Sequence, residues 1–213
     1  MKTQFKAQLK SKNKLVIFSL LFSLILASCA KQGDMTIREA MEAYRRQNYE
    51  DAASLFKRAL SEDTNYSEET ICNFIANIYM AQGDFAEANV YIERFLEKKS
   101  DYRMLVQLGR NYKEIGDNKK AAESYNRAIS LNPKKGEAYA SLGSLQIAEG
   151  DFSSAVENLK KAAEFEPKIA VIHANLAVAY ALGGDKEAAE EEFKKAKELK
   201  CENLEEFRER AGL

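Results

Sequence analysis

The strongest constraint on this chain is a Gly-Asp pair that recurs at an almost constant spacing. Gly116-Asp117, Gly150-Asp151 and Gly184-Asp185 follow one another at 34 residues, and Gly83-Asp84 precedes the first of them by 33. A fixed period of about 20–50 residues is typical of proteins built from stacked copies of one unit. We therefore expect a repeat array. The other positions that keep the period are Ala121, Ala155 and Ala189, Leu108, Leu142 and Leu176, and Pro133 with Pro167.

Each period reads as two helices joined by a turn. Leu105, Leu108 and Tyr112 are spaced by three and four residues, which places them on one helical face. The Gly-Asp pair then predicts a helix end followed by a helix start, because glycine adopts the left-handed conformation and aspartate caps free N–H groups. Asn132-Pro133 ends the second helix, since the residue before proline avoids helical dihedrals.

The pattern resembles the tetratricopeptide repeat, W-x2-L-G-x2-Y followed by small and aromatic positions and a proline. Leu108-Gly109, Tyr112 and Pro133 carry the resemblance, whereas Gln146 and Cys201 depart from it in later units. The resemblance implies an all-α, right-handed α-solenoid of about five helical hairpins. We expect the solenoid over 36–203, with units at about 33–66, 69–101, 102–135, 136–169 and 170–203, and a capping helix over 204–213.

The first 28 residues are typical of a signal peptide. They hold five lysines and no acidic residue, and end in thirteen uncharged residues, Leu15–Ala27. As a helix this segment would reach about 20 Å, short of the roughly 30 Å hydrocarbon core. Leu26-Ala27-Ser28-Cys29 resembles the lipobox of bacterial lipoproteins, which implies acylation of Cys29 and a short tether over 29–35. The alternative is an uncleaved anchor in which this cysteine is buried.

Charge and composition exclude several functions. Beyond the signal peptide the chain has 27 basic and 33 acidic residues, so we expect no attraction to nucleic acid. A single histidine, His173, argues against a His-rich metal site, and we expect this residue to pack in the core. No catalytic or phosphate-binding motif is present. We expect a protein that is not an enzyme and that needs no cofactor or metal.

The resemblance implies that partners bind on the concave face, which the first helix of each hairpin lines. The middle of this face is predicted to be basic and its far end apolar, which favours a protein or peptide with acidic and apolar residues. The alternative is that these residues are ordinary surface positions and that binding uses another face. The candidate groove residues are Asn73, Asn77, Arg103, Val106, Arg110, Lys113, Ser144, Ile147, Val171, Val178 and Leu182.

Together these features predict a membrane-anchored interaction scaffold of the bacterial cell envelope, with outer-membrane or pilus assembly as candidate roles. Ala30 is not the acidic residue that retains some lipoproteins in the inner membrane, so the outer membrane is favoured. Two alternatives stay open: a soluble or homo-oligomeric structural protein, and a non-catalytic subunit of an envelope enzyme complex. The sequence leaves the oligomeric state and the partner open.

We predict that Cys29→Ala blocks processing, because the lipobox cysteine supplies the sulfur that is acylated before cleavage. The expected product is an uncleaved precursor, recognised by an intact mass that includes residues 1–28 and no acyl chains. A mature chain whose mass contains no acyl chains would contradict lipid attachment.

Overall fold

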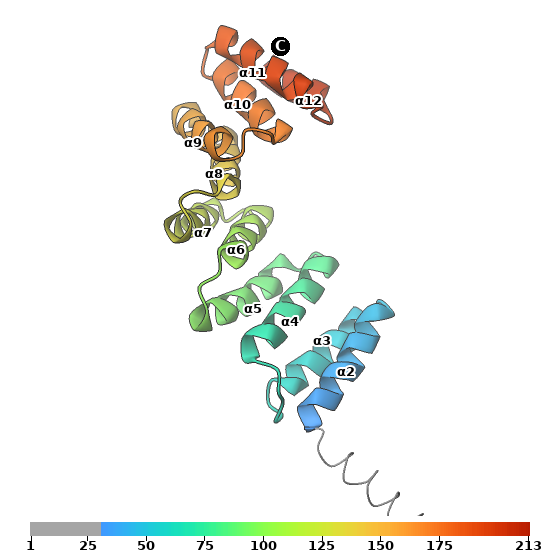
Figure 1. The fold of residues 1–213 in the computed structure, drawn as a ribbon. Coiled ribbons are helices and arrows are strands. Elements are labelled where there is room, and N and C mark those ends of the chain that lie inside the picture. Colours follow the sequence, from blue (N-terminus) through green and yellow to red (C-terminus); the bar gives the residue numbers. More distant parts are fainter. Residues whose placement is uncertain (1–30) are drawn as a thin grey trace, which may run out of the picture. The chain divides into compact units, whose positions relative to one another are not determined.

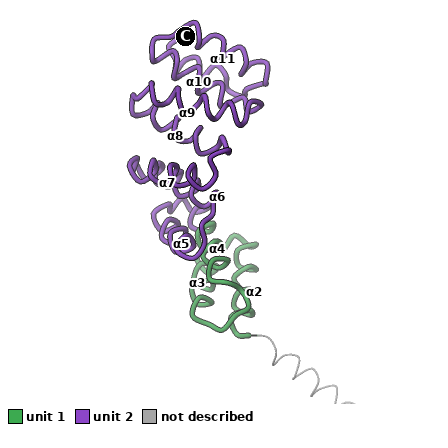
Figure 2. The backbone as a smooth tube through the Cα atoms, turned by 60° about the vertical axis from the view of Figure 1, so that its left-hand side comes forward, with its two compact units in different colours: residues 1–78 green, residues 79–213 purple. Residues whose placement is uncertain are grey.

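The computed structural model describes residues 31–213, and this part of the chain forms eleven α-helices and no strand (Figure 1). The predicted signal peptide and Cys29 lie outside the described residues. Two compact units divide the chain: unit 1 ends at Ile78, and unit 2 comprises Tyr79–Leu213 (Figure 2). The predicted all-α fold is confirmed.

Unit 1 contains α2 (Gln32–Arg45), α3 (Tyr49–Ala59) and most of α4 (Glu68–Gln82), because the boundary between the units falls inside α4. Helices α2 and α3 pack together as a hairpin around buried Ile37 and Phe56. The ring of Phe56 stacks on Phe74 of α4, with 5.0 Å between centroids.

The first helix begins earlier than the sequence predicts. The expected tether over 29–35 is too long and the expected solenoid start at residue 36 is too late, because α2 already starts at Gln32. The physical reason is that the residues around Lys31 and Asp34 are held by the connection between α3 and α4, as described below. Sequence periodicity carries no signal for such a tertiary contact.

Unit 2 holds three complete hairpins, which pair as the period predicts, together with α5 and α12, because the boundary inside α4 divides the predicted hairpin of α4 and α5. Within it α6 packs on α7, α8 on α9, and α10 on α11. The first helices of these hairpins also contact one another, α6 with α8 and α8 with α10. The helices are α5 (Phe85–Lys98), α6 (Tyr102–Glu114), α7 (Asn118–Leu131), α8 (Gly136–Glu149), α9 (Phe152–Phe165), α10 (Ala170–Leu182), α11 (Lys186–Glu198) and α12 (Leu204–Ala211).

The Gly-Asp pairs form the turns that their chemistry predicts. Gly116 and Gly150 have φ of 82° and 80°, the left-handed conformation that ends a helix. The side chain of Asp117 then accepts from the N–H of Lys120, and Asp151 accepts from Ser154, at 3.1 Å in both cases. One dipeptide therefore both ends a helix and starts the next.

Small residues allow the two helices of a hairpin to approach closely. A Cβ on Gly109 would lie 2.5 Å from the ring of Tyr125, and one on Gly143 would lie 2.6 Å from Leu159. Such distances are well inside van der Waals contact, so larger residues would push the helices apart. Tyr125 and Leu159 are themselves almost fully buried.

The last helix covers the end of the array. Ala211 of α12 is buried in one cluster with Leu176 and Phe193, and the partly buried Phe207 packs against the same cluster. Arg208 forms a bidentate ion pair with Glu190, at 2.7 and 3.0 Å. The last hairpin of an array has no following repeat to cover its apolar face, and here α12 covers it.

His173 is buried and takes part in a polar network inside the last hairpin. Its Nδ1 lies 2.6 Å from Oε2 of Glu192, and its Nε2 lies 3.0 Å from the carbonyl oxygen of Pro167. The other oxygen of Glu192 accepts from Lys195 at 2.7 Å. The expected core position is confirmed, but no sequence pattern indicates the carboxylate beside the ring.

We predict that Gly150→Val destabilises a fragment of residues 31–213 by about 1–3 kcal/mol, because a β-branched residue is strained at positive φ. A Cβ at this position meets no atom within 4 Å, so the cost comes from the backbone alone. The matched control is Ala148→Val, an exposed position with helical dihedrals two residues earlier. Equal chemical denaturation midpoints for the two variants would refute the assigned turn.

We also predict that Glu192→Ala lowers the free energy of unfolding by about 1–3 kcal/mol, because it removes the carboxylate that pairs with Nδ1 of the buried His173. Glu191→Ala serves as control, since Glu191 is exposed on the same helix. Denaturant titration of both variants measures the difference. A loss no greater than that of the control argues against the network.

Candidate functional site

The candidate site is a hollow on the layer formed by α6, α8 and α10 in unit 2. These are the first helices of three successive hairpins, and they lie side by side because each packs on the next. The hollow has a volume of about 310 Å³. Its lining residues are Arg110, Lys113, Glu114, Tyr125, Ala140, Ser141, Ser144 and Asn175.

The charges around the hollow are mixed. Arg110 donates to Glu137 at 2.6 Å, so its positive charge is already compensated. Lys113 is exposed and has no ion-pair partner among residues 31–213, and Glu114 adds a negative charge to the same wall. The expected cationic middle of the groove is therefore reduced to one uncompensated ammonium group beside a carboxylate.

Tyr125 is the aromatic member of the lining. Its side chain is only 1% exposed and lies beneath Gly109. Burial raises the pKa of this phenol to about 12, so the hydroxyl group keeps its proton at neutral pH.

Three of the predicted groove residues are part of the core. Val106, Ile147 and Val178 are 2%, 7% and 0% exposed, so their side chains cannot line an open groove. Ile147 and Val178 belong to one buried cluster with Leu176. The physical reason is that these first helices are covered by neighbours on several sides, which widens the buried face beyond the packing stripe.

The predicted apolar wall on α10 is also broken. Val171 and Leu182 are exposed by 45% and 40% but lie at opposite ends of the helix, about 16 Å apart at 1.5 Å per residue. Ala174 and Val178 between them are fully buried. Neither exposed residue lines the hollow, and nor does Arg103, which is exposed at the start of α6.

Asn73 and Asn77 belong to unit 1 and form a separate feature. The amide of Asn77 donates to the carbonyl and side-chain oxygens of Asn73, at 2.8 and 3.1 Å. A cavity of about 440 Å³ beside them is largely aromatic and apolar. Its lining residues are Met41, Tyr44, Arg45, Phe56, Phe74 and Asn77.

Of the predicted groove, the structure brings together Arg110, Lys113 and Ser144. It adds Glu114 and Asn175, which sequence reasoning missed. A signal for Asn175 was present, because it is an amide in the otherwise mostly apolar helix α10. An amide both donates and accepts hydrogen bonds, which suits recognition of a peptide backbone.

Residues 31–213 contain neither a metal-ligand cluster nor a helix that could span a membrane. No set of three or more His, Cys, Asp or Glu side chains in this part of the chain is placed to hold a metal ion. Within the same residues, no helix combines the length and the apolar character needed to cross a bilayer.

The fold and the hollow define a repeat protein of stacked helical hairpins. Family models of the tetratricopeptide repeat match residues 102–135 in one case, and residues 43–109 and 146–200 in another. The matched residues make up more than half of the chain. The chain belongs to the tetratricopeptide repeat family.

Solved structures share this fold at low identity. A crystal structure of MamA is 22% identical, with a TM-score of 0.70, and the match covers 85% of this chain and 96% of that one. MamA from Desulfovibrio magneticus RS-1 is 19% identical, with a TM-score of 0.68 and coverage of 78% and 94%. YrrB, described as having an unusual peptide-binding site, is 24% identical, with a TM-score of 0.65 and coverage of 79% and 87%. No curated protein matches the chain.

Proposed function

We propose that this chain is a protein-binding scaffold of the bacterial cell envelope, held on a membrane by lipid at Cys29, and that the hollow of α6, α8 and α10 receives a segment of its partner. The observation that carries the binding site is the hollow itself, in which Lys113, Ser144 and Asn175 converge. The peptide-binding site described for YrrB, which shares the fold, supports the same use of this architecture.

The lining specifies the chemistry of the ligand. Lys113 offers a positive charge that forms no ion pair within residues 31–213, so it favours one carboxylate on the partner. Glu114 in the same wall disfavours a run of acidic residues there. Ser144 and Asn175 supply hydrogen bonds for the backbone of an extended peptide. The proposed ligand is therefore a polar peptide segment with a single acidic residue placed against Lys113.

Membrane attachment rests on the sequence, through the basic start, the short apolar run and the lipobox that ends at Cys29. Two or three acyl chains exceed the one-chain limit of reversible binding, so the attachment would be stable. Such an anchor would hold the hollow near the membrane that carries the chain.

A photo-crosslinking amino acid at Ser144, in the full-length chain expressed in cells, tests the proposed function. We expect a discrete adduct with a partner protein from this position. The matched control is Ser153 on α9, which is exposed and does not line the hollow. Adducts of equal yield from both positions, or from Ser153 alone, would rule out the hollow as the binding site.

We predict that Lys113→Glu weakens binding of that partner by at least about tenfold, or about 1.4 kcal/mol, because it removes the uncompensated charge and adds a repulsive one. Arg103→Glu makes the same change of charge on the same helix outside the hollow, and we expect it to change affinity little. Titration of the crosslinked partner, once purified, measures both. If the Arg103 variant loses as much affinity, the effect is one of overall charge and the site is wrong.

A further inference from the structure

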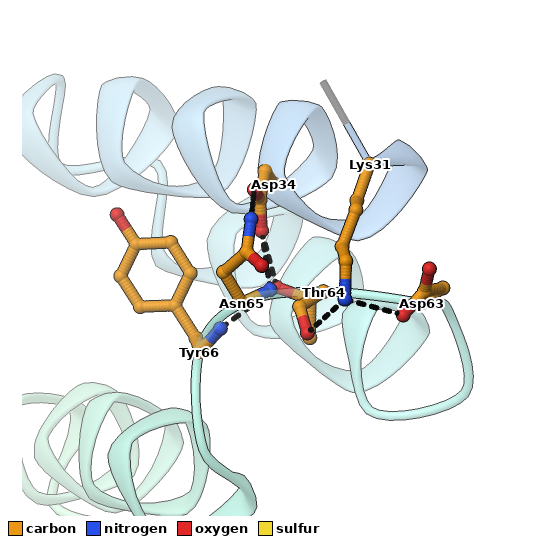
Figure 3. A network of polar contacts seen from close by, with 6 residues as sticks. All are labelled: Lys31, Asp34, Asp63, Thr64, Asn65 and Tyr66. Atoms are coloured by element: carbon orange, nitrogen blue, oxygen red, sulfur yellow. Dashed lines mark hydrogen bonds and ion pairs between the residues drawn. The ribbon is translucent and has the colours of Figure 1, made fainter. Parts of the chain in front are cut away.

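The start of α2 is bound to the connection between α3 and α4 (Figure 3). The ammonium group of Lys31 donates to Oδ1 of Asp63 at 2.9 Å and to the carbonyl oxygen of Thr64 at 3.3 Å. The backbone N–H of Gly33 donates to the carbonyl oxygen of Asp63 at 3.0 Å. These bonds attach Lys31 and the first turn of α2 to the segment that follows α3.

Asp34 is the centre of this contact. Its Oδ1 accepts from the hydroxyl of Thr64 at 2.6 Å and from the backbone N–H of Asn65 at 2.8 Å. Its Oδ2 accepts from the side-chain amide of Asn65 at 2.6 Å. The Thr64 hydroxyl and the Asn65 backbone N–H hold the pKa of Asp34 below its ordinary value, so the carboxylate is ionised at neutral pH.

The two segments also fit closely. A Cβ on Gly33 would lie 2.8 Å from Cβ of Thr64 and 2.9 Å from the carbonyl oxygen of Asp63. Glycine at this position lets the backbones come together, and a larger side chain would separate them. We call residues 31–34 together with 63–66 the N-terminal clamp.

The clamp lies very close in sequence to the proposed lipid attachment. Only Ala30 stands between Lys31 and Cys29, and two residue steps span at most about 7 Å at 3.3–3.6 Å each. A tether this short cannot carry a fixed residue far from its acylated neighbour.

Two residues in or next to the clamp have large exposed side chains. Met35 follows the clamp on α2 and is 45% exposed, and Tyr66 belongs to the clamp and is 38% exposed. Tyrosine is enriched where a membrane meets water, because its ring is apolar and its hydroxyl is polar. Lys31 is paired with Asp63, and Glu62 with Arg58, whereas the ionised Asp34 accepts only from the neutral groups of Thr64 and Asn65, so the clamp keeps a single net negative charge.

We propose that the N-terminal clamp rests on the lipid surface, with Tyr66 and Met35 in the headgroup region, so that the first hairpin has a fixed orientation on the membrane. The proposal rests on the proposed lipid attachment at Cys29. The occupant of this surface is a lipid bilayer, because the acylated residue is within about 7 Å of the clamp. The clamp and the short linker to Cys29 together fix the orientation of unit 1 on the membrane.

Tryptophan fluorescence tests the orientation, because the chain contains no tryptophan of its own. Tyr66→Trp places a single reporter on the clamp, and we call it the clamp reporter. Tyr44→Trp places the distal reporter on a similarly exposed residue of the same hairpin, nine residues beyond Met35 on α2 and about 14 Å further along the helix. The full-length acylated proteins are reconstituted into vesicles of phosphatidylethanolamine and phosphatidylglycerol that contain brominated lipids, which quench at short range.

We expect the clamp reporter to be quenched at least roughly twofold more than the distal reporter, since surface-bound apolar side chains enter only the outermost 5–10 Å of the bilayer. Asp34→Ala, added to the clamp-reporter protein, should remove most of this excess, whereas Glu50→Ala, at an exposed residue of α3, should leave it unchanged. A twelve-residue Gly-Ser insertion after Ala30 should abolish the difference, because the clamp can then leave the surface.

The outcomes separate this proposal from the one it rests on. Equal quenching of the two reporters in chains whose mass confirms acylation overturns the fixed orientation and leaves the lipid anchor intact. An excess at the clamp reporter that survives the Asp34→Ala change overturns the role of the clamp. A full-length chain whose mass contains no acyl groups overturns both the anchor and the fixed orientation.

Discussion

The close approach of the two helices within a hairpin is the constraint on which the structure depends. The ring of Tyr125 fills the space in which a Cβ of residue 109 would lie, and Leu159 does the same at residue 143. One hairpin alone cannot bury these side chains, so the next hairpin must cover them. As a consequence α6, α8 and α10 lie side by side, and the hollow that we propose as the binding site is formed on their shared face.

The repeat and its turns could be predicted from the sequence because they depend on local chemistry. A Gly-Asp pair at Gly150-Asp151 ends one helix and caps the next whatever lies around it. The lining of the hollow was predicted less well. Helical spacing shows that Val106 and Val178 share a face with exposed residues, but it does not show how many neighbouring helices cover that face. Asn175 could have been found, because it is an amide in the otherwise mostly apolar helix α10.

The polar contacts could not be predicted, because they join residues far apart in the chain. Arg110 forms an ion pair with Glu137 on the next hairpin. This pair compensates the positive charge of Arg110, which the sequence suggested was available for a ligand. His173 is hydrogen-bonded to Glu192, and Asp34 accepts hydrogen bonds from Thr64 and Asn65. These contacts revise the expected ligand from an acidic and apolar peptide to a polar one with a single acidic residue. The contacts of Lys31 and Asp34 also mean that these residues, expected to belong to a tether, are held in the N-terminal clamp.

Hydrogen–deuterium exchange of the full-length chain, with and without a partner identified by crosslinking at Ser144, is the direct test of the hollow as the binding site. We expect the partner to slow exchange of backbone amides in α6, α8 and α10, because these helices line the hollow and a bound ligand suppresses local opening. We expect little change in amide exchange in α7, α9 and α11, except at residues that contact α6, α8 or α10. Protection confined to α7, α9 and α11, with α6, α8 and α10 unchanged, would contradict binding at the hollow.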